Sequence, residues 1–252
     1  MPIDWSQYTA AVFRPTLGRL KPITAVEHIA LDDLVGIDRQ KERLVANTRV
    51  FLSGKQAQNA LLWGSRGTGK SSLIKALLTA YHNEGLRVIE FYKGDLQHLP
   101  DIVDTIRDEP WRFILYLDDL TFREGEASYT YLKSAMEGSI ESAPENLLVY
   151  ATTNRRHLVP EYQSENRATI IRDGEIHYGD AVEEKISLAD RFGLWLSFYS
   201  GSEADYLQIV DHYFRDRPEI DREELHRQAR RFAAERASRS GRTAWQFWRT
   251  YS

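Results

Sequence analysis

The 252-residue sequence contains no cysteine. This absence excludes disulfide bonds, thiolate catalysis and cysteine-ligated zinc or iron–sulfur clusters. The sequence also lacks an apolar run of membrane-spanning length, and its first residues, which include Asp4, carry no apolar segment typical of a signal peptide. From these absences we expect a cytoplasmic location and no membrane partner.

A large excess of charge of one sign is also missing. The 33 Lys and Arg residues and 37 Asp and Glu residues give a net charge of −4. Net charge therefore does not support nucleic-acid binding, which would need a local basic patch. The seven histidines show no paired metal-ligand spacing, so we expect them to be surface or packing residues. Length and composition suit a globular protein with one large and one small domain.

Short apolar runs alternate with amphipathic stretches through the middle of the chain. Strands are predicted over residues 60–63, 86–91, 113–117 and 147–151, and helices over 38–52, 72–81, 99–107 and 129–140. Strands that alternate with helices imply a parallel sheet covered on both faces. Three more helices are predicted after residue 201, which suggests a small C-terminal lid.

Two segments do not follow this alternation. Residues 169–178 are typical of a β-hairpin, with Asp173 and Gly174 at the turn. Such a hairpin either contacts a partner or a pore, or is a peripheral decoration or part of a subunit contact. Residues 1–30 carry Trp5 and Phe13 among turn-forming residues. We expect this segment to be an arm that packs on the main body or docks on a neighbouring subunit.

The most informative stretch is the octapeptide Gly64-Ser65-Arg66-Gly67-Thr68-Gly69-Lys70-Ser71. It lies between a predicted strand and a predicted helix, which is the context that a phosphate-binding loop requires. Its glycines allow backbone N–H groups to close around phosphates, and the helix start adds unpaired N–H groups. Lys70 can reach the β- and γ-phosphates, and the Ser71 hydroxyl can ligate Mg²⁺. Together with Ser72, the loop predicts a nucleoside-triphosphate site.

Polar residues also follow the next predicted strands. Asp118 and Asp119 end the strand at 113–117, and Asn154 follows the strand at 147–151. Ligands of open parallel sheets lie beyond the carboxyl ends of the strands. We therefore assign Asp118 to the metal and Asp119 to the attacking water, while the Asn154 amide can bond the γ-phosphate and that water.

Two arginines are candidates for stabilising charge on the γ-phosphoryl group. Arg191 lies in the stretch Ala189-Asp190-Arg191-Phe192-Gly193, and Arg242 opens the last predicted helix. A guanidinium can neutralise the oxygens of a loose transition state. Composition alone does not distinguish either residue from an ordinary surface ion-pair arginine.

Together these motifs resemble the AAA+ ATPase superfamily over nearly all of the chain after residue 30. The phosphate loop matches Walker A, Asp118 and Asp119 match Walker B, and Asn154 matches sensor 1. The resemblance also implies three roles that the residues alone do not give. Val35 and Gly36 match the adenine-side segment, Arg191 matches the arginine finger, notably that of the Holliday-junction helicase motor, and Arg242 matches sensor 2.

The sequence is also similar to an uncharacterised bacterial branch of AAA-type ATP-binding proteins that is defined by a domain of unknown function. The similarity is carried by residues 60–72, 118–120, 151–158 and 187–194. More distantly, the chain resembles transposase-helper and helicase-loader ATPases.

The resemblance implies an α/β P-loop NTPase fold with a parallel five-stranded sheet, flanking helices and a C-terminal helical lid. It implies an N-terminal arm over 1–30, a nucleotide-binding domain over 31–200 and a lid over 201–252. It also implies ATP and Mg²⁺ as ligands. The expected assembly is a homo-oligomer, of which a ring is one form, with an active site that a neighbour's Arg191 completes.

The function implied by the resemblance is an ATPase that remodels or loads a protein or nucleoprotein partner. One departure matters, because AAA+ motors usually carry glutamate where this chain has Asp119. A displacement of about 1 Å can cost roughly a hundredfold in rate, so an alternative is a slow-hydrolysing nucleotide-controlled binding switch.

A further alternative is a DNA-binding helper ATPase of the helicase-loader type, suggested by arginines near the C-terminus. Interspersed glutamates favour a solvated, salt-bridged helix instead. The arginines concerned are Arg227, Arg230, Arg231, Arg236, Arg239, Arg242 and Arg249.

Overall fold

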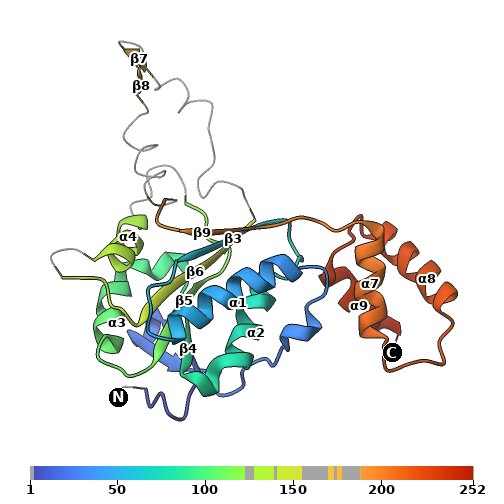
Figure 1. The fold of residues 1–252 in the computed structure, drawn as a ribbon, viewed down its shortest axis with the longest axis horizontal. Coiled ribbons are helices and arrows are strands. Elements are labelled where there is room, and N and C mark those ends of the chain that lie inside the picture. Colours follow the sequence, from blue (N-terminus) through green and yellow to red (C-terminus); the bar gives the residue numbers. More distant parts are fainter. Residues whose placement is uncertain are drawn as a thin grey trace.

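The computed structural model describes residues 3–122, 128–138, 141–154, 170–172, 175–177, 188 and 190–251. A seven-stranded sheet forms the centre of the molecule, with the strand order β2-β1-β4-β5-β6-β3-β9 (Figure 1). Its strands are β1 (Ala10–Arg14), β2 (Arg19–Pro22), β3 (Ala60–Gly64), β4 (Leu86–Glu90), β5 (Arg112–Leu117), β6 (Leu147–Thr153) and β9 (Leu194–Phe198).

The middle of this sheet is the predicted parallel one. Strands β4, β5, β6, β3 and β9 are all parallel to their neighbours. The prediction of five strands is wrong for the whole sheet, because the N-terminal segment adds two. β1 pairs parallel with β4, and β2 pairs antiparallel with β1. The α/β class and the mostly parallel sheet are confirmed.

The first strand joins the sheet because it is apolar and finds an open edge at β4. Four consecutive residues of β1, Ala10 to Phe13, are buried. The preceding Trp5 packs edge-on against Phe113 at a centroid distance of 4.9 Å, and Arg87 Nε donates to the Trp5 carbonyl at 2.8 Å. The N-terminal segment therefore packs on the body of its own chain.

Helices cover both faces of the sheet because strand residues alternate in direction. On β5, Phe113, Leu115 and Leu117 lie in one buried cluster, whereas Ile114 and Tyr116 lie in the other. The first cluster includes residues of α3 (Leu99–Ile106) and α4 (Tyr129–Glu137), and the second includes residues of α1 (Asp38–Leu52) and α2 (Lys70–Tyr81). Figure 1 shows these two layers on either side of the strands. Short 3-10 turns lie between these elements: η1 (Pro15–Leu17), η2 (Leu31–Asp33), η3 (His82–Glu84) and η4 (Lys93–His98).

The C-terminal helices α7 (Glu203–Tyr213), α8 (Arg222–Glu235) and α9 (Gly241–Tyr251) gather at one end of the molecule (Figure 1). They have a buried core of their own, which includes Tyr206, Phe214 and Phe247. Ser202 and Asp205 form a capping box at the start of α7. None of the helices in the described part of the chain is both long and apolar enough to cross a membrane.

The predicted hairpin is present as a separate two-stranded sheet. β7 (Ile170–Arg172) and β8 (Glu175–His177) pair antiparallel, with Ile171 opposite Ile176. Its turn residues, 173 and 174, lie outside the described residues, and its role stays a prediction.

Candidate functional site

The phosphate loop begins where β3 meets β9. Gly64 has a φ of 126°, and a Cβ placed on it would lie 1.9 Å from the Phe198 carbonyl oxygen. The next residue, Ser65, donates its backbone N–H to that oxygen at 2.8 Å. Glycine is required here because the loop turns against the backbone of the neighbouring strand. The loop ends at Gly69, which precedes the first helical residue of α2, Lys70.

Lys70 lies inside the loop with only 7% of its surface exposed. Its Nζ donates to the carbonyl oxygens of Gly64 at 2.9 Å and Ser65 at 2.7 Å, and to Asn154 Oδ1 at 3.2 Å. The ammonium group therefore holds the start of the loop to the end of β6. A bound phosphate would compete with these three acceptors for the three N–H donors of the group.

Burial lowers the pKa of Lys70, and the charge of Arg242 acts in the same direction. The nearby carboxylates of Asp118 and Asp119 oppose this shift. A buried cation beside two acids, one of which can hold a metal ion, suits a polyanion that arrives together with that ion.

The two acids after β5 are held by different partners. Asp118 Oδ1 accepts from Ser71 Oγ at 2.9 Å and from Thr152 Oγ1 at 2.5 Å. Asp119 Oδ1 accepts from Asn154 Nδ2 at 2.7 Å, and its backbone N–H donates to Thr152 Oγ1 at 3.0 Å. The Thr152 hydroxyl therefore links both acids. Sequence reasoning did not assign it a role, although it lies two residues before the predicted Asn154.

Burial raises the pKa of Asp118, but hydrogen bonds from Thr152 and Ser71 outweigh it and hold the pKa below its usual value. Asp118 therefore remains an anion at neutral pH. By contrast, burial and the charge of Asp118 raise the pKa of Glu90, which ends the neighbouring strand β4.

The donor set at this edge fits Mg²⁺. Ser71 and Asp118 offer a hydroxyl and a carboxylate oxygen, and this ion is usually held by one or two carboxylates together with phosphate and water. Within the described ranges, no group of three or more His, Cys, Asp or Glu side chains forms a protein-only metal cage. The site therefore suits a metal ion whose remaining ligands are oxygens of a bound phosphate and of water.

A cleft of about 890 Å³ opens between the sheet and the C-terminal helices. Gly64 and Ser65 are not among its lining residues, but both give their carbonyl oxygens to Lys70. The predicted site residues that line it are Val35, Gly36, Arg66, Gly67, Thr68, Gly69, Lys70, Ser71, Ser72, Asp118, Asp119, Asn154 and Arg242. The structure thus brings together almost every predicted site residue.

Arg191 is the exception. Its carbonyl accepts from Asn59 Nδ2 at 3.4 Å, and the nearby Leu194 pairs with Ala60 at the start of β3. Arg191 therefore lies at the amino ends of the strands, whereas the phosphate loop follows their carboxyl ends. Five residues of β3 separate the two edges by roughly 15 Å at about 3.3 Å per residue.

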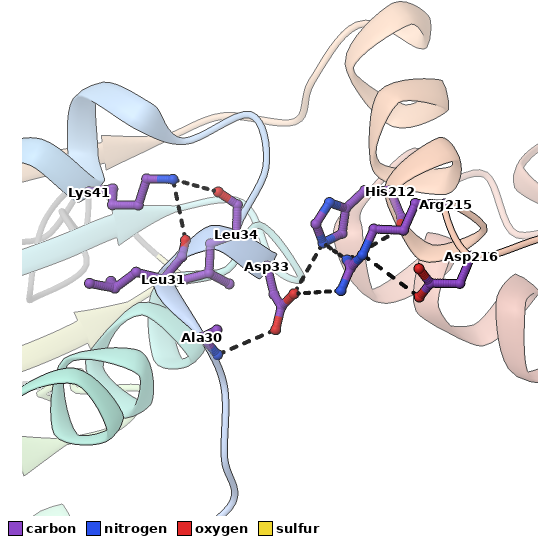
Figure 2. Close-up of polar contacts among 8 residues, drawn as sticks. All are labelled: Ala30, Leu31, Asp33, Leu34, Lys41, His212, Arg215 and Asp216. Carbon is purple, nitrogen blue, oxygen red and sulfur yellow. Dashed lines mark hydrogen bonds and ion pairs between the residues drawn. The ribbon is translucent and has the colours of Figure 1, made fainter.

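A polar bridge between the body and the C-terminal helices was missed from the sequence. Asp33 Oδ1 lies 3.2 Å from His212 Nε2 and 3.4 Å from Arg215 Nη2 of the α7 region (Figure 2). Lys41 steadies the body side by donating to the carbonyl oxygens of Leu31 at 3.3 Å and Leu34 at 3.2 Å. The bridge borders the cleft beside Val35 and Gly36, because Asp33, His212 and Arg215 also line it. Its partners are too far apart in the sequence for a local pattern to reveal them.

The C-terminal helices also contact the phosphate loop directly. The backbone N–H of Arg242, near the start of α9, donates to the Gly67 carbonyl at 3.3 Å. The predicted sensor arginine therefore lies beside the loop, on a helix that belongs to the other side of the cleft.

Solved structures with a similar fold include those of RuvB from Thermotoga maritima. Two single-residue variants match with TM-scores of 0.51 at 14% and 13% identity, each over 88% of this chain and 71% of theirs. A structure described as the RuvB Holliday junction branch migration motor matches at 15% identity over the same shares, with a TM-score of 0.49. At these identities the likeness concerns the fold alone, which is that of AAA+ ATPases.

No curated protein matches the sequence significantly. A family model does match it, over residues 6–252, and carries the description "protein of unknown function (DUF815)". The predicted AAA+ resemblance is confirmed at the level of the fold, and the chain belongs to the DUF815 family.

Proposed function

We propose that the protein is an ATP hydrolase that uses nucleotide-dependent motion to remodel or load a protein or nucleoprotein partner. One observation carries the proposal. A single hydrogen-bonded cluster at the phosphate loop runs from Lys70 through Asn154, Asp119, Thr152 and Asp118 to Ser71. That cluster lies in a cleft closed on its far side by helices. The constellation matches the needs of phosphoryl transfer, in which positioning and charge stabilisation dominate.

Each residue has a separate task in this mechanism. The loop N–H groups and Lys70 bind the β- and γ-phosphates, and Asn154 orients the γ-phosphate and the attacking water. Ser71 and Asp118 would hold Mg²⁺, which neutralises charge on the phosphate oxygens. Asp119 orients the water and accepts its proton as the new O–P bond forms and the bond to the β-phosphate oxygen breaks.

The position of Arg191 supports a homo-oligomer. This side chain lies one strand length from the loop of its own chain, so as a finger it serves the site of a neighbouring subunit. Such a finger contributes about 10³ to 10⁵ in rate. A shared site of this kind makes hydrolysis depend on assembly, in a ring or another head-to-tail arrangement.

A nucleotide-controlled binding switch is the second candidate. Asp119 has a φ of 51°, in the left-handed region that non-glycine residues rarely adopt, and its carboxylate is held by Asn154. Because its side chain is one methylene shorter and its backbone is constrained, Asp119 does not place its carboxylate where the usual glutamate would. Such a protein binds ATP firmly and hydrolyses it slowly.

The arrangement of the C-terminal arginines gives less support to a DNA-binding helper. Arg230 and Arg239 both pair with Glu203, at 2.8 and 3.3 Å, and Arg231 pairs with Glu235 at 3.3 Å. These contacts describe a salt-bridged solvent face rather than a row of cations awaiting phosphates.

Steady-state ATP turnover of the purified full chain, measured beside nucleotide binding, separates these functions. The hydrolase proposal expects Mg²⁺-dependent turnover that the Lys70→Ala variant abolishes together with binding. Binding without turnover favours the switch. Unchanged nucleotide affinity in Lys70→Ala contradicts both, because the charge that faces the phosphates would then be dispensable.

The remodelling role has a separate test. An Asp119→Asn variant loaded with ATP should hold a partner in the bound state, so crosslinking should capture the same protein repeatedly. The Lys70→Ala variant is the matched control, since it cannot load ATP. Equal capture by both variants would argue against an ATP-dependent partner.

A further inference from the structure

The predicted finger is held by an acid on another element. Arg191 Nε lies 2.6 Å from Oε1 of Glu137, the last residue of α4. The Arg191 side chain is 17% exposed and that of Glu137 is 44% exposed. Nε is the guanidinium nitrogen nearest the side-chain stem, and its contact with Glu137 is an ion pair that acts through charge rather than through an aligned hydrogen bond. A charge this close to the stem restrains the position of the planar group.

The backbone fixes Glu137 at the end of its helix. Gly138 follows with a φ of 77°, and a Cβ on it would lie 2.4 Å from the Glu141 carbonyl oxygen. The helix therefore stops directly after Glu137. A carboxylate at the carboxyl end of a helix faces the negative end of the dipole, which disfavours it. The Arg191 guanidinium supplies the compensating charge.

The two partners are also positioned by one packed core. Leu132 of α4 is fully buried, and Leu188 and Phe192, which flank Arg191, are 2% and 1% exposed in the same cluster. Most surface ion pairs join two mobile side chains and contribute little. Here the elements on both sides of the pair are anchored, so the geometry of the pair is set by the fold.

We propose that Glu137 is a positioning residue for the reaction: its carboxylate orients the Arg191 guanidinium that one subunit presents to the ATP site of the next. This inference rests on the shared site of the proposed function. It predicts that a substitution of Glu137 lowers ATP turnover only when it lies in the subunit that donates the finger, and not when it lies in the subunit that hydrolyses ATP.

A complementation experiment can tell in which of the two subunits Glu137 acts. A Lys70→Ala chain keeps its finger and has no working site, whereas an Arg191→Ala chain keeps its site and has no finger. Mixing the two full-length variants should restore turnover that neither shows alone. Glu137→Gln is then placed either on the Lys70→Ala chain, as the donor, or on the Arg191→Ala chain, as the acceptor.

We expect Glu137→Gln on the donor to lower the restored turnover by about tenfold or more, since a misplacement of about 1 Å can cost roughly a hundredfold. On the acceptor it should have no effect. In an otherwise native chain it should lower kcat and leave KM for ATP unchanged, because the finger acts in the transition state. Glu137→Asp keeps the carboxylate, so it should lower the turnover less than Glu137→Gln does.

Glu141→Gln on the donor is the matched control. It removes a nearby ion pair of similar kind, with Arg107 at 3.3 Å, and should leave complementation intact. Equal effects of Glu137→Gln on donor and acceptor, or none on the donor, overturn the inference while the shared site stands. A failure of the parent variants to complement overturns the shared site and the inference together.

Discussion

At the scale of single residues, the Thr152 hydroxyl connects the two acids of the site. It donates to Asp118 at 2.5 Å and accepts from the Asp119 backbone at 3.0 Å. We expect Thr152→Val, which keeps the shape and removes the hydroxyl, to destabilise the fold at neutral pH by about 1–3 kcal/mol. It should also raise the pKa of Asp118.

The pH dependence of that loss follows from the lowered pKa of Asp118. A carboxylate with a lowered folded-state pKa contributes stability above its unfolded pKa, about 4, which is lost as pH falls through the folded value. Denaturant unfolding of native protein and Thr152→Val should therefore differ most near pH 7 and converge in acid. A difference that does not change with pH would show that the bond to ionised Asp118 is not its source.

The length of the Asp119 side chain is a second feature that a single substitution can test. If the short acid limits hydrolysis, Asp119→Glu should raise kcat at unchanged ATP affinity, by up to about a hundredfold. Single-turnover measurement of phosphate release isolates the chemical step. Asp119→Asn is the control and should lose turnover. A slower Asp119→Glu enzyme would mean that the constrained backbone at this position, with its φ of 51°, is matched to aspartate.

Much of the site was predictable because parallel strands end at one edge. Asp118 and Asn154 come together for that reason, and the glycine pattern locates Lys70. The roles of Thr152 and of the Asp33 bridge were not predictable, since each depends on a side chain meeting another element. Val35 and Gly36 were predicted only through family resemblance, and they do line the cleft.

At the scale of elements, the first two strands show the limit of local patterns. The run Ala10 to Phe13 is only four residues long, and its strand exists because β4 offers an unpaired edge. The central strands β5 and β6 were predictable because their apolar runs are longer and buried on both faces. The pairing of β1 with β4, a strand far along the chain, leaves no such pattern in the sequence.

The bridge from η2 to α7 predicts a change in the motion of the C-terminal helices. Removing the Asp33 charge by Asp33→Asn should speed hydrogen exchange in α7 when no nucleotide is bound, because one link across the cleft is weakened. Asp216→Asn is the matched control, since Asp216 also pairs with Arg215, at 3.9 Å, within the C-terminal segment itself (Figure 2). Equal exchange rates in Asp33→Asn and native protein would contradict the claim that the Asp33 contacts restrain α7.

At the scale of the whole molecule, the two ends of the parallel strands carry different groups of the proposed shared site. The carboxyl edge carries the phosphate loop and its acids, and the amino edge carries Arg191 with Glu137. Under the proposed shared site, one chain holds one half of two different sites. In the proposed assembly, head-to-tail association would join these halves, and binding of ATP at one junction would then move the helices that flank it.

The central claim is that the ATP site is complete only between subunits. The most direct measurement is specific ATPase activity over a wide range of protein concentration, with oligomeric state followed in the same samples. The account predicts that activity per chain rises as the chain assembles, and that Arg191→Ala binds ATP normally while losing about 10³-fold or more in turnover. Full activity per chain in a verified monomer would contradict it.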